Sequence, residues 1–154
     1  MKNFFKKGIT LLEVMMTIAI LLIIVGIATP QFLKIKNVQI LKSTTGDIVS
    51  VLDSARAETL ASLNSKEYGV HFETNRIVLF VGNVYNSLDA TNQVIGISSP
   101  ATISTISFAG GSDVFFNRLT GTASKAGSVV VSLTSSPSLT KTITVSATGQ
   151  VSIN

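Results

Sequence analysis

The stretch Lys6-Lys7-Gly8-Ile9-Thr10-Leu11-Leu12-Glu13 leads into an apolar run that continues to Leu33, and this segment decides the fold of the chain. At about 1.5 Å of rise per residue, a helix over residues 8–33 exceeds a hydrocarbon core of about 30 Å, so the segment is long enough to span a membrane. Glu13 is the only ionisable residue in the run. A carboxylate in such a helix is costly, so Glu13 needs a partner or a pathway.

Three interpretations of this segment compete. A secretory signal peptide has a basic start, an apolar region of about 7 to 15 residues and a small-residue cleavage site after that region. Here the apolar region is longer, and Gly8 lies before it, directly after the lysines. A plain membrane anchor fits the length but gives Gly8 and Glu13 no role. The third interpretation is a processing site that lies between the lysines and the apolar run.

Gly8 followed by Ile9-Thr10-Leu11-Leu12-Glu13 resembles the class III signal of type IV pilins and type II secretion pseudopilins. The resemblance implies that a prepilin peptidase cleaves between Gly8 and Ile9 on the cytoplasmic side and that Ile9, which stands where the family usually has phenylalanine, becomes N-methylated. It also implies that Glu13, five residues into the mature chain, pairs with a charge during assembly. Pro30 stands where many members carry a proline that bends the helix.

The charge of the chain is concentrated in its first residues. The formal net charge is +4, from 12 basic and 8 acidic residues, and three of the basic residues are Lys2, Lys6 and Lys7. Without them 9 basic residues remain against 8 acidic ones, a net charge of +1. These lysines are typical of a cytoplasmic N-terminus. A mature chain so close to neutrality predicts no specific nucleic-acid binding, and any weak binding should be lost with salt.

After Pro30 the pattern becomes amphipathic. Apolar residues recur mostly every three or four positions, with charged residues between them, which predicts a helix lying on a core. These apolar positions are Ile35, Val38, Leu41, Ile48, Val51, Leu52, Ala55, Leu60 and Leu63. We therefore expect one long helix from about Ile9 to about Leu63, with a bend at Pro30 because proline removes a backbone donor and crowds the preceding turn.

Beyond Asn64 the apolar period falls towards two, and turn residues interrupt the chain. This pattern predicts antiparallel strands, of which the first two form a hairpin around Thr74-Asn75. The expected strands cover residues 68–72, 76–81, 94–97, 102–108, 113–116, 128–134, 141–146 and 150–153. The chain has no cysteine, so neither a disulfide nor a thiolate metal site can hold this head together.

The head resembles the H-type pseudopilins. The resemblance rests on the strand and turn Val114-Phe115-Phe116-Asn117-Arg118-Leu119-Thr120-Gly121, and on the hairpin that ends in Thr148-Gly149 before a short last strand. Some relatives, the FimT-like minor pilins, bind DNA through arginines that follow this last glycine. Gln150, Val151 and Ser152 stand there in this sequence, so the resemblance does not extend to DNA binding.

Catalytic and metal sites find little support in the sequence. His71 is the only histidine, and any Ser-His-Asp site would have to use it. Its place beside Phe72 in an expected strand favours a half-exposed strand residue instead. One histidine and scattered acids do not predict a metal site, and no glycine-rich phosphate loop precedes a helix. Arg76 and Arg118 are interpreted as surface or strand-end arginines. We therefore expect no enzyme activity and no cofactor.

The sequence predicts an α+β protein with the pilin fold, in which a long N-terminal helix packs on an antiparallel β-sheet head. The expected parts are a leader at 1–8, a membrane and filament-core helix at 9–33, an amphipathic helix at 34–64 and a head at 65–154. The expected function is that of a filament subunit, minor or major, of a type IV pilus-like or type II secretion machine. It would begin in the inner membrane with an extracytoplasmic head and then join a periplasmic or cell-surface filament. The alternative is an anchored β domain that binds an extracellular ligand without assembling.

Overall fold

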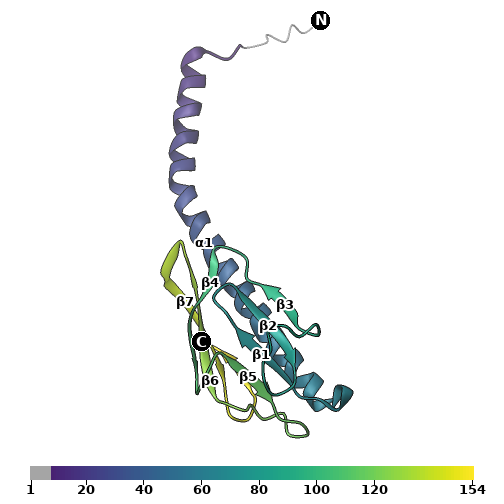
Figure 1. Cartoon of the computed structure of the whole chain (residues 1–154). Helices are drawn as coiled ribbons and strands as arrows, with labels where there is room; N and C mark the ends of the chain where they lie inside the picture. Colours follow the sequence, from purple (N-terminus) through teal and green to yellow (C-terminus); the bar gives the residue numbers. More distant parts are fainter. Residues whose placement is uncertain (1–7) are drawn as a thin grey trace, which may run out of the picture. The chain divides into compact units, whose positions relative to one another are not determined.

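The computed structural model describes residues 8–154, apart from the side chains of Ala28 and Pro30. It contains the helix α1 (Leu11–Leu60), the short 3-10 helix η1 (Leu63–Ser65) and eight strands (Figure 1). The strands are β1 (Tyr68–Phe72), β2 (Arg76–Val81), β3 (Gln93–Gly96), β4 (Ala101–Phe108), β5 (Asp113–Phe116), β6 (Gly127–Leu133), β7 (Ser136–Val145) and β8 (Val151–Ile153). The expected α+β architecture, a long N-terminal helix with antiparallel strands, is confirmed. The chain divides into two compact units, Met1–Lys36 and Asn37–Asn154.

The ends of α1 differ slightly from the expected ones. Thr10 precedes the first turn, and its Oγ1 accepts a hydrogen bond from the Glu13 N–H at 3.2 Å, so the helix begins at Leu11 rather than Ile9. At the other end Ser62 and Asn64 have left-handed backbone angles, with φ of 50° and 52°. A right-handed helix cannot continue through such angles, which is why α1 ends at Leu60 and not at Leu63.

The strands form two four-stranded sheets rather than one. The first has the order β3-β2-β1-β5 and the second the order β4-β6-β7-β8, and every pairing is antiparallel. Because β5 pairs with β1, the chain leaves the first sheet after β3, builds β4, and returns. The alternation of apolar residues predicts which face of a strand is buried, but it does not specify the neighbouring strand.

The strand β7 begins five residues earlier than expected. The sequence predicts a strand at 141–146, whereas β7 begins at Ser136 and makes a longer hairpin with β6. The register shifts after Ser132, which pairs with Thr140, while Leu133 pairs with Ser136. Residues 137–139 therefore form an irregularity in the strand, and this accommodates Pro137, which has no N–H to donate to a neighbouring strand.

A single core joins the second half of α1 to both sheets. The helix contributes Leu41, Ile48, Leu52 and Ala55, all of them buried. The sheets contribute Tyr68, Val70, Phe72, Ile77, Leu79, Val114 and Phe116 from the first, and Ala101, Ile103, Phe108, Val129, Val131, Leu133, Ile143 and Val145 from the second. Burial of these apolar side chains is the main favourable contribution to the stability of a head that has no disulfide.

The expected buried face of the helix was partly wrong. Ile35, Val38, Leu60 and Leu63 are exposed. Three threonines are buried in addition to the apolar residues: Thr44, Thr45 and Thr59. Thr59 Oγ1 donates to the Ala55 carbonyl at 2.8 Å and accepts from the Tyr68 N–H at 3.0 Å, so this hydroxyl fixes the start of β1 against the helix.

Candidate functional site

The first described residues form a short non-helical segment in front of α1. Gly8, Ile9 and Thr10 are exposed and lie outside the helix, and 76% of the Ile9 surface is accessible. Glu13 is also exposed and occupies the first turn, where a negative charge is favoured by the partial positive charge of the helix N-terminus. The first seven residues of the expected leader, with Lys6 and Lys7, lie outside the described residues. The bond between Gly8 and Ile9 is accessible in the described segment.

Glycine at position 8 has no structural reason within the described chain. A Cβ placed on Gly8 would meet no atom within 4 Å, and the backbone is not left-handed there. Gly69, Gly127 and Gly149 are different, because a Cβ at each would collide with neighbouring atoms. Folding therefore explains those three glycines, whereas Gly8, like Gly26, Gly46 and Gly96, has neither a close contact nor a left-handed backbone.

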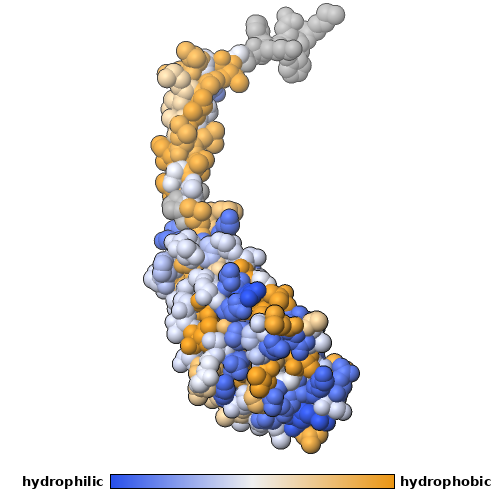
Figure 2. Space-filling model, viewed as in Figure 1, coloured by the Kyte–Doolittle hydropathy of each residue, from blue (hydrophilic) through white to orange (hydrophobic). Residues whose placement is uncertain are grey.

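The first half of α1 is apolar on all sides. Large apolar side chains from Leu11 to Leu33 are exposed, and the helix is long and apolar enough to cross a membrane by length and composition. Figure 2 shows hydrophobic residues covering the visible face of this part of the helix. The helix is continuous through position 30, although the side chain of Pro30 is outside the described residues. The bend expected at Pro30 stays a prediction.

His71 lies in β1, and its ring packs against a surface loop instead of joining a catalytic group. Its ring stacks on Tyr85 with the centroids 3.9 Å apart and the planes 9° apart, and Tyr85 also meets Phe80 edge to face. The residues between β2 and β3 are thereby held against the outer face of the first sheet. His71 Nδ1 is buried without a hydrogen-bond partner among the described residues, so no triad is assembled around it.

Burial makes His71 sensitive to acid. Desolvation holds its pKa below the usual 6.5, and this effect outweighs the attraction of Glu73 and Asp113. Because the folded pKa is the lower one, the unfolded chain binds the proton more readily as the pH falls through about 6.5. The free energy of unfolding should therefore be unaffected by His71 above that pH and should decrease as the pH falls below it.

We expect the urea midpoint of the head to fall between pH 7.5 and pH 5.5, and the decrease to be smaller in the His71→Phe variant. Phenylalanine keeps the ring that stacks on Tyr85 but cannot be protonated. Tyrosine fluorescence reports the unfolding, since the chain has two tyrosines and no tryptophan. An equal pH dependence in both proteins would contradict a role for His71.

The arginines have different surroundings. Arg76 forms an exposed ion pair with Glu73 at 2.7 Å, and Arg118 is exposed in the turn after β5. Arg56, which the sequence analysis did not identify, joins α1 to two distant turns: Nε donates to the Gly121 carbonyl at 3.0 Å and Nη2 to the Thr148 carbonyl at 3.4 Å. The only sequence signal for this role is the position of Arg56 between apolar residues of the helix.

Among residues 8–154, no cluster of three or more histidines and acids could hold a metal ion.

Of the functional residues expected from the sequence, only those near the N-terminus lie close to one another. Gly8, Ile9 and Glu13 lie close together in the exposed N-terminal segment, while Pro30 lies further along the apolar helix.

Residues 4–29 match the model of the prokaryotic N-terminal methylation motif. No curated protein and no solved structure matches the chain. The match indicates a prepilin leader of the type IV pilin kind, with processing by a prepilin peptidase and assembly with other pilins as its general implications.

Proposed function

We propose that this protein is a structural subunit of a type IV pilus-like or type II secretion filament, most similar to the H-type minor pseudopilins. In this proposal the chain is made as a prepilin, cleaved between Gly8 and Ile9, methylated at the new N-terminus and assembled through its N-terminal helix. The methylation motif at residues 4–29 supports the leader, and the resemblance of the head supports the subtype.

The observation that carries this proposal is the methylation motif at residues 4–29, which leads into a helix with an exposed apolar surface. Nothing within the described chain requires glycine at position 8, yet it stands directly before an accessible bond and a helix with an apolar surface. The place of Gly8 between the lysines and the apolar helix fits a peptidase that cleaves after glycine at the membrane face.

The proposed organisation follows from the same reasoning. Residues 1–8 would be the leader, 9–33 the membrane and filament-core helix, 34–64 the amphipathic helix and 65–154 the head. The chain would cross the inner membrane once with its head outside the cytoplasm, and it would leave the bilayer when it joins the filament. Transfer of the apolar segment from lipid to a helix-packed filament core keeps this surface away from water in both states.

Mass spectrometry of the N-terminus in the native source tests this proposal. The expected result is a mature chain that begins at Ile9 and carries one additional methyl group on its α-nitrogen. The Gly8→Leu variant should keep its leader because the peptidase site is changed. The Gly26→Ala variant should be processed normally, since a Cβ at position 26 meets no atom within 4 Å.

The two function classes predict different N-termini. An anchored β domain that does not assemble would keep the intact leader, and equal processing of wild type and the Gly8→Leu variant would exclude the proposed cleavage. Recovery of the processed chain in sheared filaments, rather than only in the membrane, tests the assembly part of the proposal separately.

A further inference from the structure

The turn between β5 and β6 exposes a leucine in an unfavourable conformation. Leu119 has φ of 68° and is 82% exposed. A left-handed backbone is unfavourable for a residue with a side chain, and a branched apolar side chain in water adds no compensating burial. Strain of this kind persists only where the surrounding structure enforces it, and it is found at sites that bind other molecules.

Hydrogen bonds enforce this conformation. The Gly121 N–H donates to the Asn117 carbonyl at 2.9 Å, and the Asn117 N–H donates to the Thr122 carbonyl at 2.9 Å. The Asn117 side chain adds a bond to Thr122 Oγ1 at 3.0 Å, and Arg56 holds the Gly121 carbonyl from the helix. The turn is therefore fixed before any partner arrives, so ordering it costs little on binding. We call Arg118 and Leu119 the turn knob.

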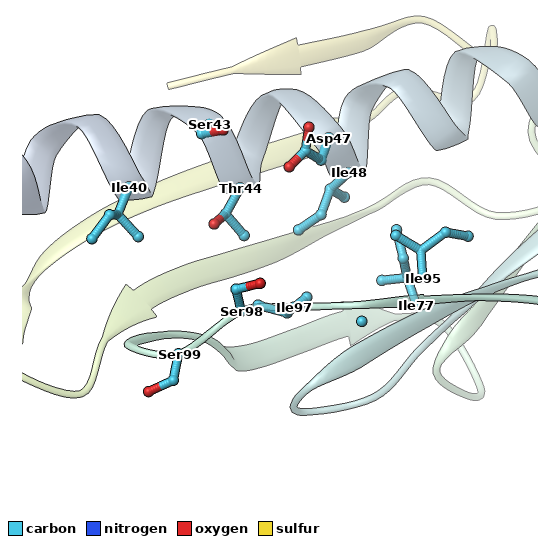
Figure 3. Close-up of a pocket in the computed structure, with 11 residues that line it drawn as sticks. Ile40, Ser43, Thr44, Asp47, Ile48, Ile77, Ile95, Ile97, Ser98 and Ser99 are labelled. Atoms are coloured by element: carbon cyan, nitrogen blue, oxygen red, sulfur yellow. The ribbon is translucent and has the colours of Figure 1, made fainter.

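A cavity of about 240 Å³ lies elsewhere in the same unit, between α1 and the segment that follows β3. Figure 3 shows side chains from the helix facing those of the segment across this space. Its apolar lining consists of Ile40, Ile48, Ile77, Ile95 and Ile97. Asp47 also lines it and is exposed, and it forms no ion pair within residues 8–154. We call this space the helix cavity.

The turn knob and the helix cavity complement each other in size and charge. The helix cavity is open, and Ser43, Thr44, Asp47, Ser98 and Ser99 line it together with the isoleucines. Its volume of about 240 Å³ exceeds the roughly 150 Å³ of an apolar cavity that holds benzene, so the isobutyl group of a leucine fits by size. Arg118 is exposed next to Leu119, and Asp47 is exposed at the cavity, so insertion of the leucine can bring opposite charges together. Arg118, like Asp47, has no ion-pair partner in the described part of the chain.

We propose that the turn knob of one copy inserts into the helix cavity of a second copy, with Arg118 facing Asp47. The proposal rests on the filament part of the proposed function, and it requires neighbouring copies of this chain in the filament. The knob lies beside the end of α1, since a Cβ on Gly121 would be 3.0 Å from Leu60, whereas the cavity lies around Thr44. Sixteen residues of helix separate Leu60 from Thr44, about 24 Å.

The separation of the two features determines the kind of assembly. A contact between different surfaces of identical copies is heterologous, and it extends into an open helical filament when its rotation does not close a ring. The knob and the cavity belong to one compact unit, so each copy offers both at once. The contact therefore adds a second connection between neighbouring subunits, formed by the heads.

Disulfide cross-linking in cells tests this contact. The chain has no cysteine, so introduced cysteines have no native competitor. Two full-length copies are expressed together, one with Leu119→Cys and the other with Ile97→Cys, and oxidised in the filament fraction. A disulfide-linked dimer is expected. The matched control replaces Leu119→Cys with Leu88→Cys, because Leu88 is 90% exposed in the residues between β2 and β3 and should give several-fold less dimer.

Charge reversal tests the orientation. Arg118→Glu in the first copy, or Asp47→Lys in the second, should each reduce the cross-link several-fold, and both changes together should restore it. If the Leu88 control cross-links equally, or if the paired reversal restores nothing, the proposed contact is wrong. Leu119→Asn should leave the urea midpoint unchanged or raise it, because asparagine tolerates the left-handed conformation, while it reduces assembly.

The same samples separate this inference from the proposed function. A processed chain that is present in filaments but gives no Leu119–Ile97 cross-link would overturn the inference and leave the filament role intact. A chain that cross-links in the membrane but never enters filaments would overturn the filament role and support the contact between copies.

Discussion

Gly149→Ala should destabilise the head by about 3 kcal/mol or more, a large part of the 5–15 kcal/mol typical of a domain. Gly149 has φ of 79°, and a Cβ there would collide with the Gly121 carbonyl oxygen and lie 3.0 Å from Arg56 Nε. The left-handed conformation alone costs an alanine about 1–2 kcal/mol. The collision adds to this, since it separates the Gly121 carbonyl from the arginine that donates to it.

The turn that contains Gly149 cannot easily move away. Its N–H donates to the Ser146 carbonyl at 2.9 Å, and the Ser146 N–H donates to the Gln150 carbonyl at 2.9 Å. Arg56 Nη2 additionally reaches the Thr148 carbonyl at 3.4 Å. A shift that relieves the collision would therefore break contacts that hold the hairpin end to α1.

Gly110→Ala is the matched control for this variant. Gly110 has the same φ of 79°, but a Cβ there would meet no atom within 4 Å. The Gly110→Ala variant should lose only the free energy that the left-handed conformation costs an alanine, about 1–2 kcal/mol. Urea unfolding of the full chain in detergent, followed by tyrosine fluorescence, measures both. Equal losses in the two variants would show that the close approach to Gly121 contributes nothing.

Glu13→Val should strongly reduce entry into the filament while leaving membrane insertion intact or slightly improved. In a core of packed apolar helices an unpaired carboxylate would be costly, so Glu13 should pair with the α-ammonium of Ile9, its own or that of a neighbouring subunit. Loss of one partner of a buried ion pair costs about 3–5 kcal/mol. The pair would also set the register, because apolar helices can otherwise slide with little change in burial.

The structure places a helix cap at Thr10 and Glu13, and its effect must be separated from charge pairing. Thr10 caps α1 through the Glu13 N–H, and a threonine followed three residues later by glutamate or glutamine is the sequence pattern of a capping box. Glu13→Gln keeps this pattern and removes the charge, while Thr10→Ala removes the cap and keeps the charge. Charge pairing predicts that the glutamine variant assembles poorly and the Thr10→Ala variant nearly normally.

Co-assembly of each variant with its partner subunits, measured together with membrane fractionation, decides between these roles. If Glu13→Val entered filaments as well as wild type, charge pairing would be wrong, and Glu13 would then serve recognition by the peptidase or the methylating enzyme. If Thr10→Ala failed as severely as Glu13→Val, the helix cap would be the important feature.

The sequence predicted the parts of the fold that depend on neighbouring residues. The apolar run to Leu33, the hairpin around Thr74-Asn75 and the strand at 113–116 agree with the structure because each is specified by local pattern. The N-terminal methylation motif could be recognised for the same reason, as its residues are contiguous.

Features that depend on distant residues were not predictable. Thr59 is fully buried although it is polar, because its hydroxyl bonds a helix carbonyl and the start of β1. Leu60 is apolar but exposed, since the helix ends there. The helix cavity combines residues near 40–48, 77 and 95–99, and no spacing along the chain indicates that they meet.

The core described above has a consequence for the order in which the molecule can be made. Leu41 and Leu52 are synthesised early, but the side chains that bury with them include Ile143 and Val145, which follow Leu52 by about 90 residues. During synthesis the apolar face of the helix is therefore only partly covered, by the first sheet, until the hairpin of β6 and β7 is complete. Apolar surface that is exposed in this way promotes aggregation, and substitutions in β7 should reduce yield more than their cost to the finished fold would indicate.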